Sequence, residues 1–154
     1  MSLSKLDQLY DEACKYEIHV YNYHFSDTKK ASCVRVGDYK TITLDKPAIK
    51  SQAEEMVLLA EEVGHYATGS CYRIEAAANF PLAKSNQQWC EERARRWKIE
   101  KLLPFEEMKR AILECPFVYE LAEFFELQPG LVLEAYSYYT ETLGLKFETA
   151  NEDE

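Results

Sequence analysis

The sequence has little glycine or proline, five residues of each, and it is rich in aromatic residues, with eleven tyrosines and seven phenylalanines. This balance excludes a disordered or low-complexity chain. Hydrophobic residues make up 47% of the 154 positions, and a chain of that length is close to the usual size of one domain. The composition therefore predicts a packed globular protein.

Membrane and disulfide signals are also missing. No apolar run approaches the ~18 residues of a membrane span, and no basic segment followed by an apolar one opens the chain. The cysteines are odd in number and form no C-x-x-C pair: Cys14, Cys33, Cys71, Cys90 and Cys115. This pattern argues against a zinc finger or a disulfide framework. We expect a soluble, cytoplasmic protein with reduced thiols.

Positive charge is scarce, because the net charge is −9. Such a chain repels phosphate backbones, so direct binding to nucleic acid is disfavoured. The apolar spacing of residues 120–143 imitates a helix-turn-helix, but residues 111–145 contain six glutamates and no lysine or arginine. We interpret this region as a packing or protein-docking surface on which Glu120, Glu123 and Glu126 suit a basic partner.

The predicted order of elements is one helix, three strands and then helices only, which is an α+β arrangement. Apolar spacing predicts helices over 4–16, 51–68, 89–103, 106–115, 119–127 and 131–143. Alternation predicts strands over 17–24, 33–36 and 41–44, the last two joined as a hairpin through residues 37–40. Ser51 and Glu54 form a capping box, Gly69 and Pro104 follow helix ends, and residues 79–81 and 85–86 are expected in a polar loop.

The segment Glu61-Glu62-Val63-Gly64-His65 carries the candidate chemistry. Residues four apart share a helix face, so Glu61 and His65 can converge on one metal ion, while Glu62 lies beside it as a general base. The arrangement is that of H-E-x-x-H with the first His replaced by Glu. Two consecutive glutamates and a histidine on a helix are usually just a solvated charged face, so the pentapeptide alone is weak evidence.

The surrounding residues extend the pattern. Residues 58–69, Leu-Leu-Ala-Glu-Glu-Val-Gly-His-Tyr-Ala-Thr-Gly, resemble the L-A-[HE]-E-[LIV]-G-H-x-x-T-[GS] signature of the ImmA/IrrE metallopeptidase family. Residues 91–104 resemble the family's E-x-x-A-x-x-[FW]-A-x-x-L-[LIM]-x-P helix. Together the matches span most of residues 16–104. Phage-associated members of the family carry Glu at the position of Glu61.

The resemblance implies one zinc ion held by Glu61, His65 and Glu91, with water in the fourth position. Glu92 is the alternative third ligand. The resemblance also implies that Glu62 is the general base of a zinc-activated hydrolysis. Because Glu61 adds a second carboxylate, a water on the ion should be less acidic, and another divalent metal could replace zinc.

The resemblance further implies a zincin-like domain over residues 1–104, with a small β-hairpin or sheet and metal-site helices. A C-terminal helical subdomain would cover 105–148, and 149–154 would form an acidic tail. Family members cleave repressors of phages and mobile elements, so we expect an endopeptidase acting on a DNA-binding repressor. The alternative is a weak or inactive pseudo-peptidase that binds a regulator protein.

Some further residues could belong to such a site. His19 and His24 are candidate ligands or substrate contacts, although a histidine on a strand is more often an ordinary residue. Cys71 could approach the metal or be a buried thiol, and Tyr66 or Tyr72 could stabilise an oxyanion. The basic residues of 93–101 are interpreted as a solvated helix side whose charges pair with Glu92 and Glu100.

Overall fold

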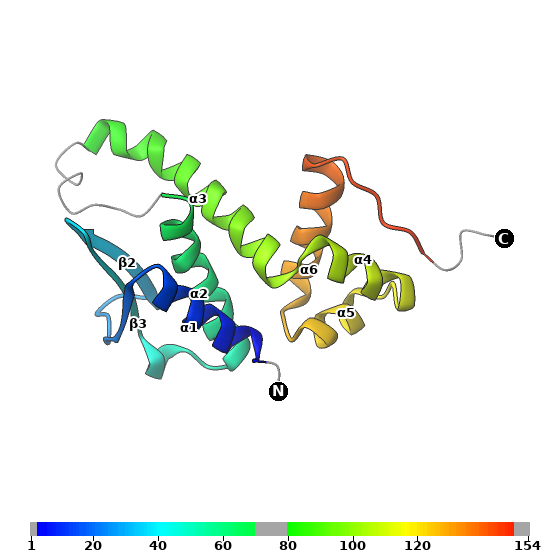
Figure 1. Cartoon of the computed structure of the whole chain (residues 1–154), viewed down its shortest axis with the longest axis horizontal. Coiled ribbons are helices and arrows are strands. Elements are labelled where there is room, and N and C mark those ends of the chain that lie inside the picture. Colours follow the sequence, from blue (N-terminus) through cyan, green and yellow to red (C-terminus); the bar gives the residue numbers. More distant parts are fainter. Residues whose placement is uncertain (1–2, 70–79, 150–154) are drawn as a thin grey trace. The chain divides into compact units, whose positions relative to one another are not determined.

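The computed structural model describes residues 3–69 and 80–149, with side chains described for 3–69 and 88–149. The chain is a mixed α+β protein of six α-helices and a three-stranded sheet within these ranges (Figure 1). It divides into two compact units, one ending at Lys98 and one starting at Ile99. None of the helices in the described ranges is long and apolar enough to cross a membrane.

The first unit contains the sheet and the helices that pack on it. Its elements are α1 (Lys5–Lys15), β1 (Ile18–Asn22), β2 (Ala31–Val36), β3 (Tyr39–Leu44), a 3-10 turn (Lys46–Ala48), α2 (Gln52–Ala67) and most of α3 (Phe80–Leu102). α1 begins where predicted, because the Ser4 hydroxyl accepts a hydrogen bond from the Asp7 amide at 3.1 Å.

The sheet has the strand order β1-β3-β2. β2 and β3 form the predicted antiparallel hairpin, with Val36 opposite Tyr39. Its turn is shorter than predicted, because Tyr39 and Lys40 belong to β3 and only Gly37 and Asp38 connect the strands. Gly37 has a φ of +59°, which suits a tight hairpin turn. β1 pairs with β3 in parallel, a pairing that the sequence did not predict.

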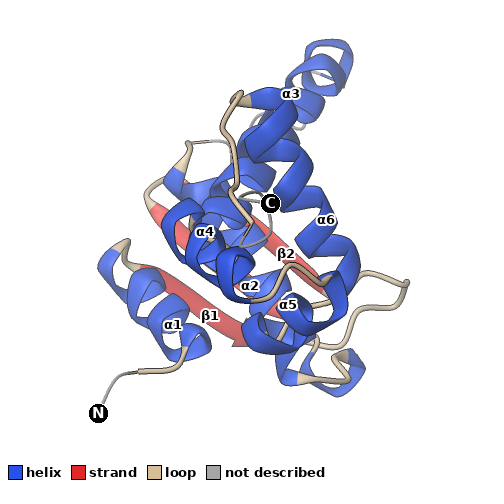
Figure 2. Cartoon of the chain, turned by 90° about the vertical axis from the view of Figure 1, so that its right-hand side faces the viewer, coloured by secondary structure: helices blue, strands red, loops and turns tan. Residues whose placement is uncertain are grey.

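One face of the sheet, whose strands are red in Figure 2, is buried against helices. α2 packs on β2 and β3, and α1 packs on α2 and β1. The buried strand residues are Ile18, Cys33, Ile42 and Leu44, and those of α2 include Met56, Leu59, Ala60 and Val63. The burial of this face fixes the rotation of α2 about its own axis, which decides where the motif side chains point.

Of the two hydrogen bonds of the predicted capping box at the start of α2, the one accepted by Ser51 is confirmed. The Ser51 hydroxyl accepts from the Glu54 amide at 3.1 Å. The Glu54 carboxylate reaches back one residue further than a capping box requires, because it accepts from the Lys50 amide at 3.3 Å. At the other end, Gly69 follows the helix with a φ of +70°, as expected for a helix stop.

The polar loop predicted before the second long helix is wrong for residues 80–88, which are helical. α3 begins at Phe80 instead of residue 89. Pro81 suggested a loop, yet it occupies the first turn of the helix, where a backbone N–H has no partner within the helix in any case. The missing donor therefore carries no penalty there.

The second unit is helical. After the end of α3 it contains α4 (Phe105–Glu114), α5 (Val118–Phe125), α6 (Pro129–Ser137) and a π-helical turn (Tyr138–Thr142). These are the three predicted C-terminal helices, with ends shifted and the last one finishing in the π-helical turn. Its core includes Leu102, Leu103, Met108 and Val132, and the buried Tyr139 hydroxyl donates to the Leu103 carbonyl at 2.7 Å.

Candidate functional site

The motif residues occupy the last two turns of α2. His65 is buried, with 6% of its side chain exposed, while Glu61 keeps 35% exposure. Their spacing of four puts them one above the other on one side of the helix. The predicted arrangement of these two side chains on a helix is therefore present.

α3 approaches this part of α2 closely at Gly64. A Cβ on Gly64 would lie 3.0 Å from the Ala94 carbonyl oxygen and 3.1 Å from the Trp97 ring. Ala94 is itself fully buried. Two small residues thus let the helix backbones meet, and the neighbouring residues of both helices come within reach of one another.

His65 and Glu91 meet across this contact. The His65 Nε2 lies 3.5 Å from the Glu91 Oε2, and 46% of the Glu91 side chain is exposed. Two tetrahedral zinc ligands at about 2.0–2.1 Å from the ion are themselves separated by roughly 3.4 Å. The imidazole and the carboxylate therefore have the donor chemistry and the spacing of two ligands of one zinc ion.

Glu61 lies beside a cation. Its Oε2 is 3.9 Å from the Lys98 Nζ, and the Lys98 side chain is 11% exposed. No group of three His, Cys, Asp or Glu side chains within the described ranges is placed to hold a metal ion. The structure thus brings two of the three expected ligands to ligand spacing and places the third at Lys98.

Glu62 is a partly buried residue beside the same side chains. Burial raises its pKa, and the charges of Glu61 and Glu91 raise it further. The charge of His65 and a hydrogen bond with Cys33 act in the opposite direction. No local sequence pattern connects a strand cysteine with a helix residue 29 positions later, so the contact of Cys33 with Glu62 could not be predicted from the sequence.

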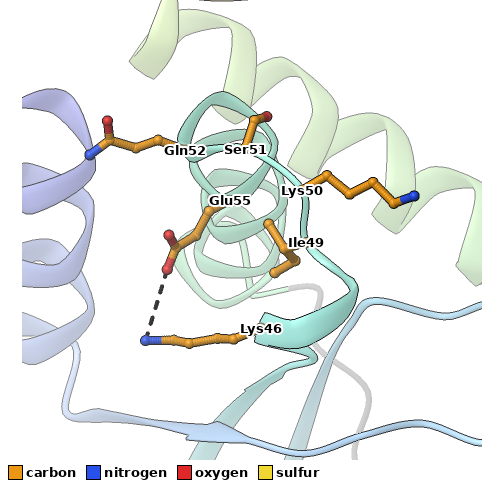
Figure 3. Close-up of a pocket in the computed structure, with 6 residues that line it drawn as sticks. All are labelled: Lys46, Ile49, Lys50, Ser51, Gln52 and Glu55. Atoms are coloured by element: carbon orange, nitrogen blue, oxygen red, sulfur yellow. Dashed lines mark ion pairs between the residues drawn. The ribbon is translucent and has the colours of Figure 1, made fainter.

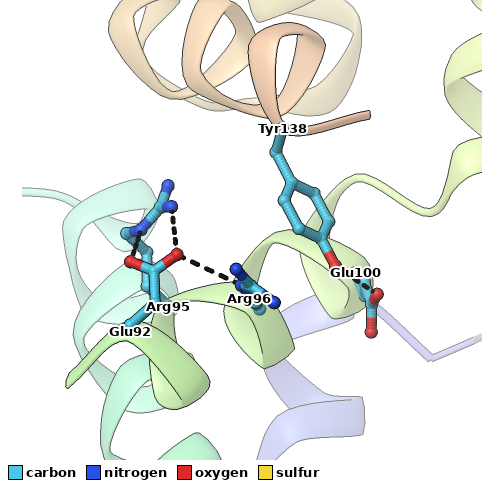
Figure 4. A network of polar contacts seen from close by, with 5 residues as sticks. All are labelled: Glu92, Arg95, Arg96, Glu100 and Tyr138. Carbon is cyan, nitrogen blue, oxygen red and sulfur yellow. Dashed lines mark hydrogen bonds and ion pairs between the residues drawn. The ribbon is translucent and has the colours of Figure 1, made fainter. Parts of the chain in front are cut away.

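The alternative third ligand, Glu92, is bound by arginines of its own helix (Figure 4). Arg95 donates to its carboxylate at 2.7 and 3.0 Å, and Arg96 donates at 3.1 Å. These hydrogen bonds, with Arg95 first, lower the pKa of Glu92. Of the two adjacent glutamates, Glu91 is therefore the one that reaches His65.

The predicted solvated basic side of α3 is confirmed for the arginines that pair with Glu92. It is wrong for Lys98, which is buried, because this position faces Glu61 and not solvent. Glu100 accepts a hydrogen bond from the Tyr138 hydroxyl at 2.7 Å, a contact within the second unit that is also drawn in Figure 4.

Tyr66 anchors α2 to the hairpin. Its hydroxyl accepts from the Thr41 amide at 2.8 Å and lies 2.7 Å from the Thr41 carbonyl and 2.8 Å from the Val34 carbonyl. The hydroxyl thus bridges the backbones of β2 and β3 one residue after His65. The structure gives this residue a clear positioning contact.

The remaining candidates have other surroundings. The His19 ring stacks on Tyr39 at 4.7 Å between centroids. The His24 Nδ1 lies 2.9 Å from Oδ2 of Asp45, a buried carboxylate that also accepts from the Phe25 amide at 3.1 Å. These contacts are those of ordinary structural residues. Residues 71 and 72, the other two candidates, lie outside the described part of the chain.

A pocket lies at the first turn of α2, at the opposite end of the helix from His65 (Figure 3). It is lined by Lys46, Ile49, Lys50, Ser51, Gln52 and Glu55. The Lys46 Nζ is 4.0 Å from the Glu55 Oε1, so these two charges offset one another. This pocket is separate from the candidate site.

Comparison of the chain with protein-family models, curated proteins and solved structures finds no match in any of the three.

Proposed function

We propose that the chain is a metal-dependent endopeptidase of the ImmA/IrrE type. The observation that carries the proposal is the 3.5 Å separation of the His65 Nε2 and the Glu91 Oε2, beside the partly buried Glu62. The sequence resemblance assigns the same three residues to the site. Their positions on two helices that touch at Gly64 support the assignment.

The donor set fits a divalent cation. Glu61, His65 and Glu91 would hold it, and two carboxylates with one imidazole are ordinary zinc ligands. The oxygen-rich set also suits manganese or iron. A bound ion of this kind supplies a Lewis acid for the peptide carbonyl and lowers the pKa of water.

Glu62 is proposed to move the proton. Its carboxyl lies beside the candidate ligands, where it can accept a proton from a nearby water and then return it. Its carboxylate would take the proton of the attacking water and deliver it to the leaving amine. The contact with Cys33 fixes the carboxyl on the side of β2.

The proposed substrate is a DNA-binding repressor. Such a protein carries basic surface, and the exposed carboxylates of α5 and its C-terminal end, Glu120, Glu123 and Glu126, would complement it. Tyr119 and Phe124, exposed at 76% and 71%, add apolar contact area on the same helix. Binding should weaken when the three glutamates are replaced by glutamine, and unchanged binding and cleavage would exclude this docking role.

A second function, binding a regulator without cutting it, is favoured by one observation. The Glu61 carboxylate lies beside the Lys98 ammonium, a cation that competes for a ligand oxygen. A chain that holds metal weakly could still bind and sequester its partner. The two functions differ at Glu62, because Glu62→Gln should abolish cleavage and leave binding intact.

Elemental analysis of the purified protein tests the metal-dependent function first. The wild type is compared with Glu61→Ala, His65→Ala and Glu91→Ala, after each protein has been incubated with zinc and desalted. We expect near-stoichiometric zinc in the wild type and loss of zinc in each variant. No metal in the wild type after incubation would contradict the peptidase and leave the binding function.

A further inference from the structure

Lys98 is a buried cation in the motif region. It lies on α3 one turn after Ala94, the residue at which α3 touches α2. Lysine is almost never fully buried unless it is paired, because removing an ammonium from water is costly. The Glu61 carboxylate, 3.9 Å away, is the opposite charge that the structure places beside it.

The position of Lys98 matters because the carboxylate that it pairs with, Glu61, is also the expected third metal ligand. His65 and Glu91 already stand at the spacing of two metal ligands, and completing the set requires the Glu61 carboxylate. A divalent cation held by Glu61 would lie close to the ammonium of Lys98, whose side chain is 11% exposed, so water would screen their repulsion only in part. The ammonium and the metal therefore attract the same carboxylate and repel one another.

We propose that Lys98 competes with a divalent cation for Glu61 and thereby lowers the metal affinity of the site. This inference rests on the proposed function, in which Glu61, His65 and Glu91 are the ligands. Without metal, the Lys98 ammonium offsets part of the negative charge of Glu61, Glu62 and Glu91. When metal enters, this stabilising pair is lost and the repulsion is added, so both effects oppose binding.

The test is a zinc titration of metal-free protein in competition with a chromophoric chelator. Lys98→Met removes the charge and keeps the length of the side chain, and Lys98→Arg keeps the charge. Lys46→Met is the matched control, since Lys46 also pairs with a glutamate of α2, at 4.0 Å, but is 54% exposed at the opposite end of the helix. Both methionine variants change the net charge equally, so a difference between them is local.

We expect Lys98→Met to bind zinc at least about ten-fold more tightly than the wild type. The Lys98 ammonium and a zinc ion a few ångströms away would repel one another measurably even at the dielectric constant of water. Lys98→Arg and Lys46→Met should stay within about two-fold of the wild type, since the local charge at Glu61 is unchanged in each. Circular dichroism verifies the fold of each variant. Lys98→Gln replaces the methionine variant if that protein does not fold.

The outcomes separate this inference from the proposed function. If the wild type binds zinc and Lys98→Met binds no more tightly than Lys46→Met, the competition is excluded and the metal site stands. If only Lys98→Met binds zinc, the competition is supported and the wild-type chain is not a metal-dependent peptidase. If neither protein binds zinc, both proposals are overturned.

Discussion

The Cβ that Gly64 lacks would lie 3.0 Å from the carbonyl oxygen of Ala94. This single contact sets the distance between α2 and α3 at the motif. The residue after Gly64 is His65, and Glu91 precedes Ala94 by three positions, so the contact also sets the distance between the two candidate ligands. Loss of the glycine should therefore affect both the stability and the site.

Gly64→Val should lower the free energy of unfolding by about 2–3 kcal/mol, because the added methyl groups meet backbone and ring atoms of α3. Urea denaturation followed by circular dichroism measures the loss. Gly130→Ala is the control, because Gly130 lies in α6 and a Cβ at that position would meet nothing within 4 Å. It should raise stability by about 0.4–1 kcal/mol, because alanine leaves the unfolded chain fewer conformations to lose. Equal effects of the two substitutions would contradict the close contact.

Tyr66→Phe should destabilise the protein by about 1–3 kcal/mol, because it leaves the Thr41 amide without the hydroxyl that it binds. Tyr39→Phe serves as the comparison. Its hydroxyl contacts that of Tyr21 on the exposed face of the sheet, so its removal should change stability by less than about 0.5 kcal/mol. Thermal unfolding of the two variants measures the difference, and a stable Tyr66→Phe protein would exclude the anchoring role.

Glu62→Gln should raise the melting temperature of the metal-free protein. In the metal-bound protein the same substitution should abolish cleavage. Burial raises the pKa of Glu62, so the folded protein loses stability as the pH rises through the ordinary glutamate pKa towards the raised one. Glutamine has no charge to bury. The increase in melting temperature over the wild type should therefore be greatest at neutral pH and disappear in acid. A melting temperature below that of the wild type at neutral pH would contradict this account.

Glu91→Gln and Glu92→Gln should differ in zinc binding although the residues are adjacent. Glu91 reaches His65, whereas Glu92 is occupied by Arg95 and Arg96. We expect the first variant to lose at least about 100-fold in zinc affinity, since the loss of a mere supporting residue already costs about 10–100-fold. The second should bind like the wild type. The reverse order in a chelator competition would make Glu92 the ligand.

The arginine contacts of Glu92 predict an acid-dependent contribution to stability. Because the pKa of Glu92 is lowered in the folded protein, its pairing stabilises the fold above the ordinary glutamate pKa of about 4.3. That contribution is lost as the pH falls through the lowered value. The side chain is 40% exposed, so the effect should stay below about 1 kcal/mol. Unfolding of the wild type and Glu92→Gln should differ at neutral pH and converge in acid, below the lowered pKa.

Residues close together in the chain account for the local structure of the site. Helical spacing places Glu61 and His65 on one side of α2, and Ser51 and Gly69 mark its ends through the chemistry of helix caps. Such features depend on residues within a few positions of one another, so they could be predicted from the sequence. The loop predicted at Pro81 is wrong, because the local sequence does not distinguish a proline in a loop from a proline in a first helical turn.

Packing between the helices decided which side chains meet. Glu91 and Glu92 differ by one position, and the contact of α3 with Gly64 selects which of them faces His65. The same packing buries Lys98 beside Glu61, where periodicity predicted a solvated lysine. Helical spacing fixes the angle between side chains on one helix, but the rotation of that helix against its neighbour is set by contacts between residues far apart in the chain.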